Sequence, residues 1–92
     1  MRIIIIVTQS LHGYREFSGV ERTRTKAEKR LKQIGGPGHT EPVEIPDGTK
    51  QIFVASRASA GGDDMIYQGV YLDYESAKKV ATDRGEVVSP PI

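Results

Sequence analysis

Few side chains in this sequence are of the types that carry out catalysis or bind metal ions. The chain has two histidines, His12 and His39, and no cysteine. A zinc-type site needs several nitrogen, sulfur or carboxylate ligands at close spacing, and neither histidine lies on a predicted helix with a second ligand one turn away. Both histidines fall in predicted loops, where solvated side chains are the ordinary case. We therefore expect no metal site, no cofactor and no catalytic residue.

Two glycine-rich segments share part of the pattern of a ligand-binding loop. Asp63 and Asp64 follow two glycines and could bind a hard cation, but the alternating ligand spacing of a calcium loop is absent. The run Gly35-Gly36-Pro37-Gly38 could present N–H groups to a phosphate, yet it follows a predicted helix and lacks a Gly-Lys-Ser/Thr ending. Ordinary turn chemistry accounts for both segments. No Gly-x-Ser-x-Gly turn supports a nucleophilic triad either.

The length and composition describe one small domain. The chain has 92 residues, with 13 lysines and arginines against 12 acidic residues and a net charge of +1. A chain of this size builds one modest core and leaves little room for a deep enclosed catalytic chamber, so we expect a protein that is not an enzyme. No stretch approaches the roughly 20 apolar residues of a membrane span. The absence of cysteine fits a reducing compartment, and we expect a cytoplasmic protein.

Charge is distributed unevenly along the chain. Residues 1–40 hold eight basic and three acidic side chains, a net charge of +5, whereas residues 41–92 hold five basic and nine acidic side chains, a net charge of −4. The basic residues gather in and just before the first predicted helix. They are Arg22, Arg24, Lys26, Lys29, Arg30 and Lys32.

This basic cluster is the main candidate for a binding surface. It could steer the protein toward an acidic partner protein, with Tyr14, Tyr71 and the loop Ser59–Asp64 contributing to the contact. It could instead neutralise phosphates of a nucleic acid, with Tyr14 or Phe17 stacking on a base. It could pair with the acidic half of a second copy, or it could be an ordinary solvated helix face. Exposed sheet edges leave a homodimer open as well.

The chain contains an internal repeat. Several residues of the first half recur 50 positions later, and Ile6-Val7-Thr8 resembles Val54-Ala55-Ser56 at an offset of 48. The pairs at the offset of 50 are Gly19 with Gly69, Val20 with Val70, Ala27 with Ala77, Lys29 with Lys79, and Gly35 with Gly85. We therefore predict a single domain, residues 1–92, made of two half-repeats that cover residues 1–46 and 47–92.

Each half is predicted to contain a strand, a shorter strand, a helix and a last strand. In the first half these are residues 2–8, 14–20, a helix that ends at Gly35, and residues 43–45. The β-branched run Ile3–Val7 predicts a central strand that is buried on both faces. Gly19 predicts a bulge or a close backbone approach.

The first helix has two candidate starting points. Capping-box spacing with Glu28 favours Thr25 as the N-cap, whereas the repeat favours Thr23, which aligns with Asp73. Its apolar stripe is Ala27, Leu31 and Ile34.

In the second half, Pro46-Asp47-Gly48-Thr49 predicts a tight hairpin that leads into a strand over residues 51–56. A strand over residues 65–72 follows, in which the even separation of Tyr67 and Tyr71 predicts that they share a face. Asp73 is the predicted cap of the second helix, and Gly85 its predicted stop. The inner face of this helix is Ala77, Val80 and Ala81, and residues 86–89 form the last strand.

These elements predict an α+β fold. Two ββα(β) half-repeats would form a mostly antiparallel sheet with two helices on one face. If the short strand before each helix is irregular, the order becomes βαββαβ, a ferredoxin-like sandwich.

The segment from Gly69-Val70-Tyr71 to Ala77 resembles small modules of phage-encoded accessory proteins, in which a Gly-Val-aromatic strand precedes a helix. The first half shows the same pattern from Gly19-Val20 to Ala27, with Glu21 in place of the aromatic residue. The resemblance implies a small binder of a host component and brings no catalytic residues. Taken together, we expect a non-enzymatic binding protein that docks on a partner protein and modulates it. A nucleic-acid-binding domain is the alternative, and a small enzyme or ligand binder is a further one.

Overall fold

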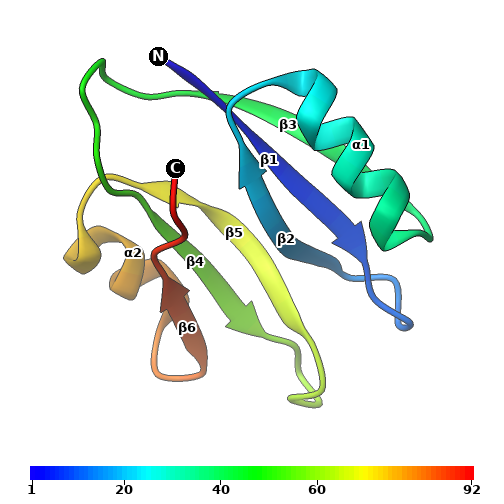
Figure 1. Ribbon diagram of the computed structural model, residues 1–92. Helices are drawn as coiled ribbons and strands as arrows, with labels where there is room; N and C mark the ends of the chain where they lie inside the picture. Colours follow the sequence, from blue (N-terminus) through cyan, green and yellow to red (C-terminus); the bar gives the residue numbers. More distant parts are fainter.

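The computed structural model describes residues 1–92 and confirms the α+β class with two ββαβ halves (Figure 1). The first half comprises β1 (Arg2–Gln9), β2 (Arg15–Glu21), α1 (Arg24–Ile34) and β3 (Gly38–Glu44). The second half comprises β4 (Phe53–Ala58), β5 (Met65–Tyr71), α2 (Tyr74–Ala81) and β6 (Gly85–Val88). Neither helix is long and apolar enough to cross a membrane.

Each half forms its own antiparallel sheet. The strand orders are β2-β1-β3 and β5-β4-β6, so the first strand of each half is the central one, as predicted for β1. This arrangement differs from the predicted one, which was a single sheet with both helices on one face. The two sheets meet along β2 and β5, and each carries its own helix on the side away from the other sheet (Figure 1). The ferredoxin-like order does not arise, because β2 and β5 are paired strands, although each pairing contains one bulge.

The predicted hairpin at Pro46–Thr49 is wrong, although the turn itself forms. The Thr49 amide donates to the Pro46 carbonyl at 3.2 Å, but β3 pairs with β1 and β4 pairs with β5 and β6. Ile45 and Ile52, on either side of the turn, are both buried in the core that the two sheets share. Because both residues are anchored in this core, the segment between them carries the chain from one sheet to the other. A second difference from the prediction is that β3 begins at Gly38, inside the predicted loop.

The central strand β1 supplies side chains to two separate clusters. Ile3, Ile5 and Val7 join the core between the sheets, and Ile4 and Ile6 pack against α1. Full burial of one such side chain contributes about 1.5–3 kcal/mol. Burial on both faces therefore explains why this strand is β-branched without interruption.

The two helices are held to their sheets to different extents. Ala27 and Leu31 anchor α1, as predicted, whereas Ile34 is 48% exposed and does not belong to the apolar stripe. Ile34 lies in the last turn, where the chain turns back toward β3. In α2, Ala77, Val80 and Ala81 all pack over Ala55 as predicted, and these small residues let the helix lie close to the strand.

The helix caps follow the repeat rather than the capping-box spacing. The Thr23 side chain accepts the Lys26 amide at 3.3 Å, and Asp73 accepts the Ser76 amide at 2.9 Å, so the caps are equivalent. Gly35 ends α1 with a positive φ of 78°. Gly85 does not end α2, which stops before Thr82. Glycine is needed at position 85 because a Cβ there would lie 2.1 Å from the Ser56 carbonyl oxygen.

A β-bulge occurs at the same place in both halves. The register shifts between Ile6 and Val7 in one half and between Ala55 and Ser56 in the other, beside two glycines with φ of 155°. The predicted bulge at Gly19 is confirmed. Ile6 pairs with Gly19 and Ala55 pairs with Gly69, so the residue of the second half that is equivalent to Ile6 is Ala55, whereas the sequence repeat had matched Ile6 with Val54. Because the second bulge inserts one residue between Tyr67 and Tyr71, their side chains lie on opposite faces of β5, which corrects the prediction of a shared face.

Candidate binding surface

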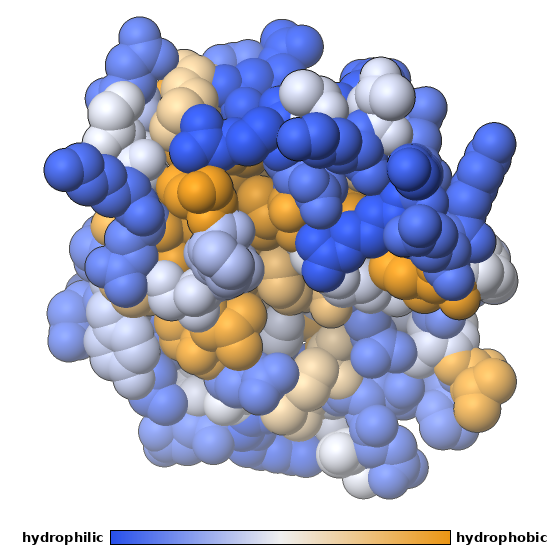
Figure 2. All heavy atoms as spheres, in the orientation of Figure 1, coloured by the Kyte–Doolittle hydropathy of each residue, from blue (hydrophilic) through white to orange (hydrophobic).

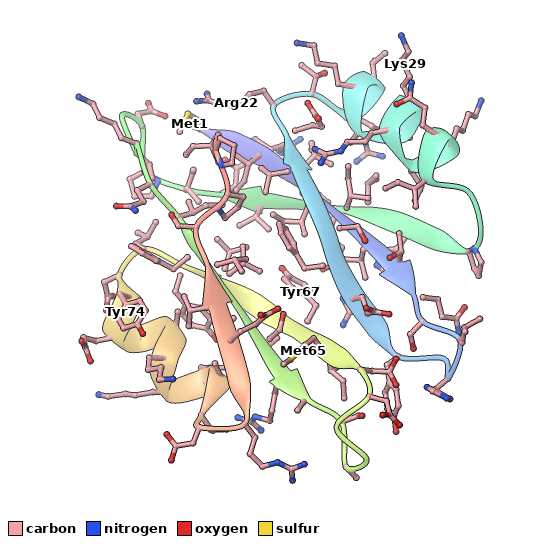
Figure 3. The ribbon with its side chains drawn as sticks, turned by 60° about the horizontal axis from the view of Figure 1, so that its bottom comes forward. Met1, Arg22, Lys29, Met65, Tyr67 and Tyr74 are labelled. Atoms are coloured by element: carbon pink, nitrogen blue, oxygen red, sulfur yellow. The ribbon has the colours of Figure 1, made fainter.

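The basic residues singled out in the sequence lie on and just before α1, and all are exposed. We call this set the basic face. Its members are Arg22, Arg24, Lys26, Lys29, Arg30 and Lys32. In Figure 2 hydrophilic side chains cover the side of the molecule where α1 lies, and in Figure 3 Lys29 extends from the helix into solvent.

Two members of the basic face contact other parts of the chain. A guanidinium nitrogen of Arg30 lies 3.1 Å from a Glu21 carboxylate oxygen, and this guanidinium also covers Gly19 so closely that a Cβ there would approach it to 2.7 Å. The Arg22 guanidinium lies 3.2 Å from the sulfur of Met1. Arg30 therefore helps hold α1 on β2, and glycine at position 19 makes room for it.

The other four cations have no carboxylate partner within the chain. Seven ion pairs are present, and none includes Arg24, Lys26, Lys29 or Lys32. These four residues are the part of the basic face that is free to bind another molecule.

The placement of these charges does not favour the helix that carries them. The first turn of α1 holds no acidic residue, and Arg24 and Lys26 lie at its positive end. A cation there opposes the helix dipole and costs about 0.3–1 kcal/mol. By contrast, α2 has Glu75 in its first turn and Lys78 and Lys79 in its last turn, the favourable arrangement. Helix stability therefore explains the charges of α2 and of Lys32 in the last turn of α1, but not those of Arg24 and Lys26.

Tyr14 and the loop Ser59–Asp64 lie together, but apart from the basic face. They line a pocket of about 220 Å³ with His12, and no residue of α1 lines it. The His12 Nδ1 atom lies 2.8 Å from an Asp64 carboxylate oxygen, an ion pair when the imidazole is protonated. This pocket thus joins the β1–β2 and β4–β5 connections, which are equivalent in the two halves.

The other aromatic candidates are part of the hydrophobic packing. Tyr71 packs in the cluster beneath α2, on the other sheet from the basic face. Phe17 stacks on Tyr67 with ring centroids 6.3 Å apart, in the core between the sheets. Neither ring lies on α1, so neither is placed beside the four unpaired cations.

A polar junction between the halves was missed in the sequence. The Arg15 guanidinium lies 5.7 Å from the Tyr67 ring centre and also forms an ion pair with Glu41, whose carboxylate lies 2.6 Å from a His39 ring nitrogen. Burial and the nearby Glu41 charge raise the pKa of Tyr67 to about 12. The even separation of His39 and Glu41 is the signal of a shared strand face, but His39 was predicted to lie in a loop and both residues precede the strand predicted at residues 43–45.

Burial acts to raise the pKa of Glu41, but hydrogen bonds and charge from His39 and Arg15 outweigh it, so the pKa lies below its ordinary value. No group of three histidine, cysteine, aspartate or glutamate side chains is placed to hold a metal ion.

Comparison of the sequence and structure with protein-family models, with curated proteins and with solved structures found no match.

Proposed function

We propose that the protein is a docking module whose basic face binds an acidic surface of a partner protein. The observation that supports this most is the group of four unpaired cations on α1, two of which lie at the end of the helix where positive charge is unfavourable. Charge held at a cost in helix stability points to a role outside the fold. Complementary charge on a partner would steer encounter and set orientation.

The mechanism is occupancy of a preformed surface. α1 begins at the Thr23 cap, ends at Gly35 and is anchored by Ala27 and Leu31, so its outer face is presented without folding on binding. A bound partner would lose access to the acidic surface that the module covers. This proposal involves no chemical step by the protein itself.

A protein partner fits the surface better than a nucleic acid. Single-stranded nucleic acids are held by aromatic rings that stack on bases beside basic residues. Here α1 carries no aromatic residue, Phe17 is packed on Tyr67, and Tyr14 lies at a separate pocket. The net charge of +1 is also far from that of a dedicated nucleic-acid-binding domain.

Charge reversal with a matched control tests the proposal. The variant Arg24→Glu/Lys29→Glu alters the basic face, and Lys50→Glu/Lys79→Glu alters two exposed lysines elsewhere. Each pair of changes takes the net charge from +1 to −3, since 1 − 4 = −3. Tagged proteins would be used to capture partners from nuclease-treated lysate of the cells that produce the protein. Arg30 is left unchanged because it contributes to folding.

We expect the wild type and the Lys50/Lys79 variant to retain a stoichiometric protein partner and the Arg24/Lys29 variant to lose it. Circular dichroism would establish that both variants are folded. Equal capture by the two variants would contradict the proposal. Capture that disappears when nuclease is added would favour the nucleic-acid alternative instead.

A further inference from the structure

A cleft of about 520 Å³ opens between β2 and the inner face of the β5-β4-β6 sheet. Its volume lies within the range of about 300–1,000 Å³ that is common for small-molecule sites. Met65 on β5 lines the cleft, and its side chain is labelled in Figure 3. No residue of α1 lines the cleft, so it is separate from the basic face.

Three carboxylates from different parts of the chain line the cleft. Glu16 comes from β2, Asp63 from the loop before β5, and Glu86 from β6. None of them takes part in an ion pair, and no lysine, arginine or histidine lines the cleft with them. Like charges that share a concave surface produce a negative potential that attracts cations.

A serine that is almost wholly buried also faces the cleft, on a different element from the carboxylates. Ser56 is only 5% exposed, lies on the central strand β4 and lines the cleft. The Ser56 hydroxyl forms no hydrogen bond with another side chain or with the backbone. Every fully buried polar side-chain atom in the chain does have a partner, so the Ser56 hydroxyl is not fully buried and opens to the cleft. The Ser56 hydroxyl can therefore accept a hydrogen bond from a donor group that enters the cleft.

The cleft also has an apolar part. Phe17 and Met65 line it beside the carboxylates. A ligand that matches both parts has a cationic group rich in hydrogen-bond donors, joined to a short hydrocarbon stem. The carboxylates and the Ser56 hydroxyl would accept from the cation, and Phe17 and Met65 would cover the stem.

We propose that this cleft binds an alkylguanidinium or alkylammonium group. Such a group could belong to a free small amine or to an arginine or lysine side chain of a peptide. The chemistry is the same in both cases, and the two sources differ in whether backbone contacts add affinity.

The test measures binding by calorimetry and by NMR shifts, at low salt and neutral pH, with two probes. The probes are agmatine, a free alkylguanidine, and an arginine residue blocked at both ends. We expect shifts at Ser56 and Met65, and at least a tenfold weaker affinity for agmatine in Glu86→Gln and in Ser56→Ala. The matched control, Glu75→Gln on the exposed side of α2, should bind as the wild type does.

The relative affinity of the two probes identifies the source. Agmatine binding equal to or tighter than that of the blocked arginine indicates a free amine, and tighter binding of the blocked arginine indicates a peptide. No binding of either probe at millimolar concentration would overturn the proposal. So would equal loss of affinity in Glu86→Gln and Glu75→Gln, because this would mean that only net charge matters.

Discussion

Tyr67 is the side chain through which the two halves of the molecule make their most specific contact. It extends from β5 into the shared core, stacks on Phe17 of β2 and lies under the guanidinium of Arg15. The two sheets have no backbone ladder between them, so side-chain packing sets how they lie against each other. Tyr67 is also 8% exposed, which makes its truncation costly.

We predict that Tyr67→Ala lowers the free energy of unfolding by about 3–5 kcal/mol, the usual cost of removing a large buried aromatic side chain. Tyr14→Ala, at a ring that is 39% exposed, is the control and should change stability by about 0.5 kcal/mol or less. Urea unfolding followed by circular dichroism measures both. Similar stabilities of the two variants would show that the halves do not depend on Tyr67.

The ion pairs of Glu41 make stability sensitive to acid. Its pKa in the folded protein lies below the ordinary value of 4.5, so the charged carboxylate favours the folded state. This contribution is fully present above the unfolded pKa and is lost as the pH falls through the folded pKa.

We therefore predict that Glu41→Gln is less stable than the wild type at pH 6, and that the difference shrinks as the pH falls toward 3. Thermal unfolding across this range measures the effect. Asp73→Asn is a useful comparison, because hydrogen bonds from Ser76 lower the pKa of Asp73 as well, but at an exposed helix cap. A difference for Glu41→Gln that stays constant with pH would contradict the account.

At the scale of elements, the two helices carry different charge patterns on equivalent frameworks. Both follow a bulged strand and begin at a side-chain cap. α2 has charges that suit its dipole, whereas α1 has charges that oppose it at its first turn. Because the frameworks match, the proposed partner contact is what we infer to account for the charges in the first turn of α1.

We predict that Arg24→Glu raises the free energy of unfolding by about 0.3–1 kcal/mol, because it places a carboxylate at the positive end of α1. The same change should weaken partner binding. The mirror substitution Glu75→Lys in α2 should lower stability by a similar amount and leave partner binding intact. Destabilisation by Arg24→Glu would mean that the arginine serves the fold and would remove the main support for the proposed function.

The elements themselves could largely be predicted from the sequence because their signals are local. The β-branched run of β1, the bulge glycine Gly19 and the cap pair Thr23 and Asp73 each act within a few residues. The face of Tyr71 could not be predicted, because one bulge residue reverses the alternation of side chains along β5.

At the scale of the whole molecule, the arrangement of the sheets depends on contacts that no short pattern encodes. Ile45 and Ile52 flank a sequence that favours a hairpin, yet both are buried between sheets and carry the chain from one to the other. The cleft was missed for the same reason. Glu16, Ser56 and Glu86 are far apart in the chain and share a surface only after the sheets have packed.

The central claim is that the outer face of α1 contacts a partner protein, and site-specific photo-crosslinking tests it most directly. Gln33 on α1 and Gln51 before β4 are both exposed and uncharged, so a photoreactive residue at either position leaves the charge pattern unchanged. In nuclease-treated lysate of the producing cells, we predict one dominant protein adduct at position 33 and none at position 51. The Arg24→Glu/Lys29→Glu changes should abolish this adduct. The absence of a protein adduct at position 33, or the same adduct at both positions, would contradict the account.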